Sequence, residues 1–124
     1  MKFNQRECGL TVLRIGLAIL YLWFGFSQLM NGIDWVSWVP DWAVSVLHLP
    51  PAMIVLLNGL FEVALGTLLA INIWVRWVAF ILALHLFVIV LDIGASAIGV
   101  RDFSLAAATL ALALLRGKSE LPKV

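Results

Sequence analysis

The chain has 124 residues, of which 64% are hydrophobic and only 12% are charged, and its formal net charge is +1. Soluble domains are about half apolar and about a quarter charged, so this composition, with a mean hydropathy of +1.08, indicates one membrane domain. The small net charge and the lack of a dense basic patch exclude nucleic acid as a partner. A single cysteine, Cys8, excludes an intrachain disulfide and a dithiol relay.

Four apolar runs are predicted to cross the bilayer as helices, over residues 10–30, 51–71, 76–93 and 100–115. Between the first two, residues 33–49 carry Trp35, Trp38 and Trp42 on one side and polar residues on the other. This pattern predicts a short amphipathic helix in the membrane interface, with Pro40 as its first residue and an end near Leu47. The expected fold is therefore an all-α, four-transmembrane-helix bundle that takes residues 1–124 as a single domain.

The charges of the connecting segments predict how the bundle lies in the membrane. An even number of spans places both termini on one side, and most of the basic residues fall on that side: Lys2, Arg6, Arg76, Arg116, Lys118 and Lys123. The acidic residues of the other loops, Asp34, Asp41 and Asp92, fall on the opposite side, where Arg101 is the exception. The positive-inside rule then predicts a multi-pass membrane protein with both termini in the cytoplasm.

Glu62 lies near the middle of the second span, where an ionised side chain costs about 2.5–3.5 kcal/mol on insertion scales unless a partner meets it. With a rise of about 1.5 Å per residue, Glu62 and His85 both lie roughly 13 Å from the cytoplasmic end, and Arg14 roughly 6 Å. A long arginine side chain can cover that difference. We therefore expect Arg14 to pair with Glu62 as a guanidinium–carboxylate fork, with His85 as a second partner.

Helical spacing gives each span one polar or small-residue face, and such faces turn inward in lipid. The candidate buried polar site consists of Arg14, Tyr21, Asn58, Glu62 and His85. A second, outer polar cluster is expected from Gln28, Asp92, Arg101 and Asp102.

The chemistry of these residues stays open at this stage. The Arg14–Glu62 pair either fixes helix packing or forms a functional site, and a lone His85 is more often a hydrogen-bonded core residue than a ligand. Haem between the helices would need a second histidine at similar depth, whereas His48 lies in the interfacial segment. No metal site is expected, because only Glu62 and His85 share a level.

Three short motifs resemble the DoxX-like family of membrane proteins. The first span, with Leu13-Arg14-Ile15-Gly16 and the later Gly25 and Gln28, resembles that family's opening helix, which pairs an early arginine with glycine–x–x–lysine. The run from Glu62 to Gly66, followed by Arg76, resembles the second helix and its turn, and Arg101-Asp102-Phe103 resembles the closing motif. Gln28 stands where the family usually has lysine, so a cation is missing there.

The resemblance implies a four-helix protein of the cell membrane whose relatives accompany redox systems, among them a thiosulfate:quinone oxidoreductase. The first hypothesis is therefore an accessory subunit that contacts quinone and needs a redox-enzyme partner, since the chain has no flavin, haem or iron–sulfur motif of its own. The second is a protein that binds or transports lipid or another small amphiphile, where transport would need a homodimer. The third is a purely structural membrane anchor or assembly factor.

Overall fold

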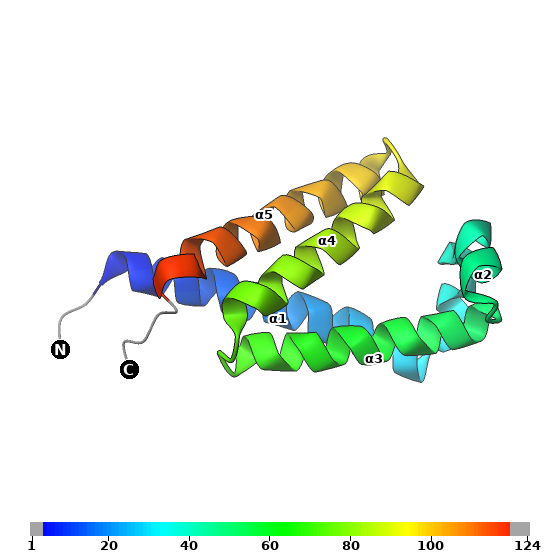
Figure 1. Ribbon diagram of the computed structural model, residues 1–124, viewed down its shortest axis with the longest axis horizontal. Helices are drawn as coiled ribbons and strands as arrows, with labels where there is room; N and C mark the ends of the chain where they lie inside the picture. Colours follow the sequence, from blue (N-terminus) through cyan, green and yellow to red (C-terminus); the bar gives the residue numbers. More distant parts are fainter. Residues whose placement is uncertain (1–3, 120–124) are drawn as a thin grey trace.

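The computed structural model describes residues 4–119, and these form helices only (Figure 1). The elements in chain order are α1 (Gln5–Met30), the 3-10 helix η1 (Gly32–Trp38), α2 (Asp41–Leu47), α3 (Pro51–Ala70), α4 (Val75–Ile93) and α5 (Ala97–Ser119). α1, α3, α4 and α5 are each long and apolar enough to cross a membrane. The expected all-α chain with four helices able to span a membrane is thereby confirmed.

Two helices begin earlier than the apolar runs indicate, because polar side chains cap their first turns. α1 begins at Gln5 rather than at residue 10, and the Asn4 side chain accepts hydrogen bonds from the backbone N–H groups of Arg6 and Glu7. α5 begins at Ala97 rather than at residue 100, and Ser96 Oγ accepts from the Gly99 N–H at 3.0 Å. In α1 the added residues include Gln5, Arg6 and Glu7, so hydropathy alone does not predict this first turn.

The segment between α1 and α3 holds two short helices instead of one. η1 carries Trp35 and Trp38, and α2 carries Trp42 and ends at Leu47 as expected. Pro40 is not the first helical residue, since its backbone is extended (ψ 149°) and it lies just before α2. We call η1 and α2 together the cap.

The four long helices associate as two pairs, α1 with α3 and α4 with α5, and contacts between the pairs are fewer. In Figure 1 the pairs come together where the first turn of α1 and the last turn of α5 lie, and they diverge toward the cap. We call the end where the pairs come together the closed end, and the end where they diverge the cap end. Buried apolar side chains fill the bundle toward the closed end, among them Leu10, Leu17, Leu69, Val75 and Leu112.

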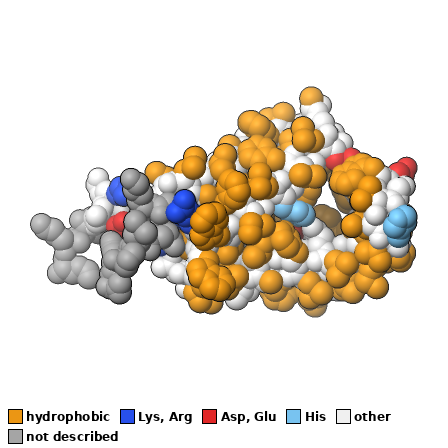
Figure 2. All heavy atoms as spheres, viewed as in Figure 1, with side chains coloured by type: hydrophobic (Ala, Val, Ile, Leu, Met, Phe, Trp, Pro, Cys, Tyr) orange, Lys and Arg blue, Asp and Glu red, His pale blue; other side chains and the backbone are white. Residues whose placement is uncertain are grey.

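The outer surface of the bundle matches a lipid environment. Figure 2 shows hydrophobic side chains over the long helices, basic side chains near the closed end, and a hollow beside the cap. Large apolar side chains are exposed on every long helix, for example Trp23 on α1 and Leu114 on α5. Because lipid gives helices no hydrophobic reason to associate, polar and close-packing contacts between them must hold the bundle together.

Candidate functional site

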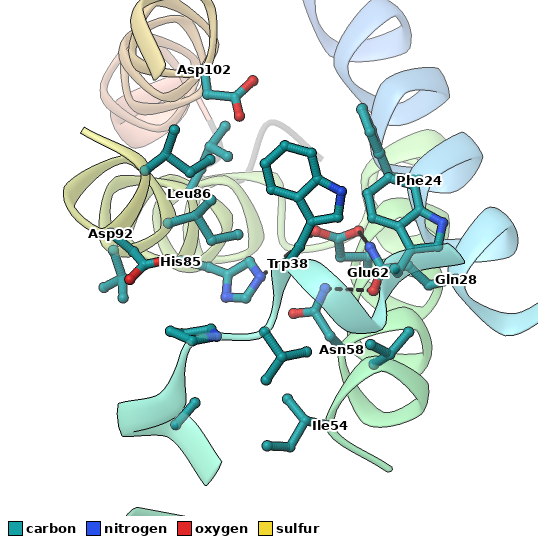
Figure 3. A pocket seen from close by; sticks show the side chains of 18 of the residues that line it. Phe24, Gln28, Trp38, Ile54, Asn58, Glu62, His85, Leu86, Asp92 and Asp102 are labelled. Atoms are coloured by element: carbon teal, nitrogen blue, oxygen red, sulfur yellow. Dashed lines mark hydrogen bonds and ion pairs between the residues drawn. The ribbon is translucent and has the colours of Figure 1, made fainter. Parts of the chain in front are cut away.

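A cavity of about 350 Å³ lies toward the cap end, between the two helix pairs and beneath the cap. All four long helices and the cap contribute to its wall, which is mostly apolar. Polar groups gather in one part of it, from α1, α3 and α4: Gln28, Asn58, Glu62 and His85 (Figure 3). A mostly apolar cavity with a few convergent polar groups is the usual form of a small-molecule site.

Glu62 is held by a chain of amide hydrogen bonds between α3 and α1. Asn58 Nδ2 donates to Gln28 Oε1 at 2.7 Å, and Gln28 Nε2 donates to Glu62 Oε1 at 3.3 Å. The three residues lie within two turns of α3 and the last turns of α1, where the glycines Gly25 and Gly59 bring the backbones together. Glu62 is only 5% exposed, so these bonds fix one carboxylate oxygen and leave the other to face the cavity.

His85 approaches that second oxygen from α4. Its Nε2 lies 3.7 Å from Glu62 Oε2, which is too long for a hydrogen bond, and the nitrogen is buried without a partner. The His85 ring also packs against Phe61, with ring centroids 4.8 Å apart. Glu62 and His85, which were predicted to lie at the same depth, are thus close to each other, and a polar atom beside the pair could form a hydrogen bond with both.

Tyr21 belongs to the cavity wall but not to the Glu62 network. Its hydroxyl lies 3.0 Å from Thr109 Oγ1, and that hydroxyl in turn donates to the Leu105 carbonyl at 2.8 Å. The Thr109 proton is then engaged, so Tyr21 is the donor of the pair. This contact joins α1 to α5, one of the few polar links between the two helix pairs.

Arg14 does not pair with Glu62, contrary to our expectation. Its Nη1 donates to the carbonyl oxygens of Leu69 (2.8 Å) and Ala70 (2.7 Å), at the last turn of α3. Helix C-termini leave carbonyls without intrahelical partners and carry partial negative charge, so they compete well for a guanidinium. The depth estimate placed Arg14 correctly near the closed end but could not show that nearer acceptors exist there.

The outer polar cluster separates into three contacts. Gln28 belongs to the Glu62 network, Arg101 Nε pairs with Asp102 Oδ1 at 3.3 Å, and Asp92 Oδ1 accepts from Trp42 Nε1 at 3.3 Å. Gln28, Asp92 and Asp102 all line the cavity, whereas Arg101 is exposed and does not. Across residues 4–119, no three metal-ligating side chains gather in one place.

The tryptophans between α1 and α3, for which the sequence favours membrane anchoring over a ligand-stacking role, form an aromatic wall of the cavity. Trp35, Trp38 and Trp42 from the cap and Phe24 from α1 line the cavity, and Trp35 is oriented by donating to Ser27 Oγ at 3.0 Å. The spacing of the three tryptophans did predict one aromatic face on this segment. An interfacial helix would direct that face toward lipid. In the structure the helix pairs diverge, and the tryptophans line the cavity between them.

A family model described as DoxX matches residues 9–95 of the chain. No curated protein and no solved structure shows significant similarity to it. The match covers most of α1 and all of the cap, α3 and α4, and so includes Arg14, Gln28, Glu62 and His85. The chain belongs to the DoxX family of membrane proteins.

Proposed function

We propose that this DoxX-family protein is an accessory subunit of a quinone-linked oxidoreductase in the cytoplasmic membrane and that it binds the quinone headgroup in the cavity. The observation that carries the proposal is the pair formed by Glu62 and His85 in the cavity wall: Oε2 and Nε2 lie 3.7 Å apart without a hydrogen bond, and Nε2 is buried with no other hydrogen-bond partner. They offer an acceptor and a donor within a mostly apolar space. A redox partner subunit is part of the proposal, because quinone supplies two-electron chemistry that needs a second redox centre.

The residues of the cavity suit a neutral, flat headgroup with an apolar tail. His85 would donate a hydrogen bond to a carbonyl oxygen, and Glu62 would accept one from a hydroxyl, so the pair can meet either form of the ligand. Gln28 and Asn58 act as positioning residues, since they fix the carboxylate of Glu62. The Tyr21 hydroxyl already donates to Thr109 and is left with acceptor capacity only.

Quinone extraction from purified protein tests this function. Protein isolated in a non-ionic detergent from quinone-producing cells should carry quinone, measured by solvent extraction and chromatography. His85→Phe and Glu62→Gln should each lose it, while Asp34→Asn, an exposed change on η1 away from the cavity, should keep it. Wild-type protein that carries no quinone would overturn the proposal.

Binding of a lipid or another small amphiphile is the second candidate, favoured by the mostly apolar wall and by the hollow beside the cap. Native mass spectrometry from nanodiscs would then retain one defined lipid, and Glu62→Gln would change its headgroup preference. Transport of such a ligand would need a homodimer, because four helices enclose only a thin pathway. A monomer with no retained lipid would contradict this candidate.

The orientation in the membrane is also part of our proposal, with the closed end in the cytoplasm. Arg14 and Arg116 lie at the closed end, where Arg116 Nη1 reaches Glu7 Oε1 at 3.9 Å and Nη2 donates to Asn72 Oδ1 at 3.1 Å. The first turn of α1 and the last turn of α5 therefore share one end of the bundle. The positive-inside rule assigns that end to the cytoplasm.

A further inference from the structure

The charges around the cavity do not balance. Three carboxylates line it, those of Glu62, Asp92 and Asp102, and none of its lining residues is a lysine or an arginine. The exposed side chain of Arg101 forms an ion pair with Asp102 and offsets the charge of that carboxylate. The charges of Glu62 and Asp92 have no such partner in the part of the chain that the structure describes, apart from a protonated His85 beside Glu62.

Of these two carboxylates, Glu62 is buried and Asp92 is exposed, so the charge of Glu62 costs more to leave without a partner. It is 5% exposed, and the hydrogen bond to its Oε1 comes from the neutral amide of Gln28. Neutral donors stabilise a buried carboxylate only in part, because removing a charge from water costs several kcal/mol that an opposite charge offsets best. Its second oxygen faces the cavity, and it is there that a positive group could approach.

The cavity wall also contains aromatic side chains of the kind that receives organic cations. Trp35, Trp38 and Trp42 line the same cavity, and Figure 3 shows Trp38, His85 and Glu62 around one space. Tryptophan faces attract ammonium groups more strongly than other side chains of this type do, most of all away from water. An anionic headgroup would instead meet the like charge of the buried Glu62 and, near the cap, that of the exposed Asp92.

We propose that the cavity also binds amphiphiles with a cationic headgroup, such as lipophilic amines, with Glu62 as the counter-ion and the tryptophans of the cap around the charged group. The proposal goes beyond quinone binding and does not depend on it, although both ligands would compete for the same space. Asp92, hydrogen-bonded to Trp42 near the cap, adds a second attraction for cations that enter from the cap end.

Two probes that differ in headgroup charge test this ligand class. Decyltrimethylammonium and decanesulfonate have the same chain length, and their binding to wild-type protein in non-ionic micelles can be followed by tryptophan fluorescence. The cation should bind saturably and at least about tenfold more tightly than the sulfonate, a ratio that one close charge pair in a partly buried site can supply. Equal affinities for both probes in the wild-type protein would overturn the proposal.

Variants then assign the selectivity to Glu62. Glu62→Gln should reduce the affinity for the cation about tenfold or more and Glu62→Asp should preserve the preference, whereas Asp34→Asn, an equal loss of charge on exposed η1, should have no effect. A monodisperse Glu62→Gln protein that binds the cation as the wild type does would overturn the assignment. If that variant does not fold, the wild-type comparison of the two probes decides. Quinone content is measured separately. Protein that carries quinone but shows no preference for the cation contradicts this inference alone, and protein that prefers the cation but carries no quinone contradicts the quinone function alone.

Discussion

Arg14 acts at the end of a helix rather than at the centre of the bundle. Its guanidinium group joins α1 to the last carbonyls of α3, those of Leu69 and Ala70, near the turn that leads into α4. The Leu69 carbonyl also accepts from the Asn72 backbone N–H at 3.2 Å, and Arg14 adds a charged donor at this helix end, where water is scarce. The residue therefore supports the closed end and has no contact with Glu62 in the described structure.

Removing the Arg14 guanidinium group should weaken the fold and leave the cavity unchanged. We expect Arg14→Leu to lower the free energy of unfolding by about 1–3 kcal/mol, because the two charged hydrogen bonds to the carbonyls of Leu69 and Ala70 are lost. Thermal unfolding followed by circular dichroism measures the change, and Arg6→Leu, an exposed position in the same helix, is the control. Ligand affinity at the cavity should not change in folded protein. An Arg14→Leu protein as stable as the wild type would refute this role.

Gln28 determines how the charge of Glu62 is satisfied. The amide holds both Asn58 and Glu62 but brings no charge of its own. A lysine at this position, as the resemblance describes for the family, would place an ammonium group beside the carboxylate. The chain would then supply internally the cation that we assign to a ligand.

Gln28→Lys should therefore abolish the preference for cationic amphiphiles. We expect the affinity for decyltrimethylammonium to fall about tenfold, to the level of Glu62→Gln, since the new ammonium competes for the same carboxylate. The fluorescence titration described above measures it. Ser37→Lys adds the same charge at an exposed position of η1 and should bind the cation as the wild type does. If folded Gln28→Lys bound the cation as the wild type does, Glu62 would not be the counter-ion of the ligand.

At the scale of elements, the close approach of α1 and α3 builds the polar part of the cavity. A Cβ on Gly25 would lie 2.7 Å from Val63 Cγ2 and 2.9 Å from the Val63 backbone nitrogen, and one on Gly59 would lie 3.0 Å from the Gly25 carbonyl oxygen. Small residues that let backbones meet are typical of helix pairs in membranes. The same contact sets Gln28 opposite Asn58 and Glu62.

Gly25→Ala should consequently destabilise the α1–α3 pair although alanine favours helices. The methyl group meets backbone that cannot rotate away, so we expect a loss of about 1–3 kcal/mol, the usual cost of overpacking. Gly16 in the same helix is the matched control: a Cβ there meets nothing within 4 Å, and alanine should be neutral or stabilising by about 0.5–1 kcal/mol. Thermal unfolding in detergent compares the two. Equal stability of both variants would contradict the packing argument.

The helices and the sides that they turn toward the bundle interior could be predicted from the sequence, because a span in lipid needs a long apolar run and its polar residues turn inward. Apolar runs marked the four spans, and four-residue spacing predicted the inward side of Glu62 and Gly66, both of which are buried. The partner of Arg14 could not be predicted, since depth alone does not distinguish a carboxylate from the carbonyls of a helix end. The sequence favoured membrane anchoring over a ligand-stacking role for the tryptophans of the cap and could not decide between them, because their orientation depends on how far the two helix pairs diverge.

At the scale of the whole molecule, the closed end and the cap end differ in what holds them. Buried apolar side chains and the contacts of Arg14 and Arg116 join all four long helices at the closed end. Toward the cap end the pairs separate around the cavity, and the hydrogen bond from Trp42 to Asp92 links α2 to the end of α4. A ligand that bridges the two pairs would therefore stabilise the end that has the fewest contacts of its own.

The orientation of this asymmetric bundle can be tested with the native cysteine. Cys8 is exposed on the first turns of α1, at the closed end that we assign to the cytoplasm. A membrane-impermeant maleimide should leave Cys8 unlabelled in intact cells and label it in inverted vesicles, as detected by a mass shift of the purified protein. In a Cys8→Ser background, Ser37→Cys on exposed η1 should show the opposite pattern, because η1 lies at the cap end. Labelling of Cys8 in intact cells, with Ser37→Cys protected, would invert the bundle and place the cavity toward the cytoplasmic leaflet.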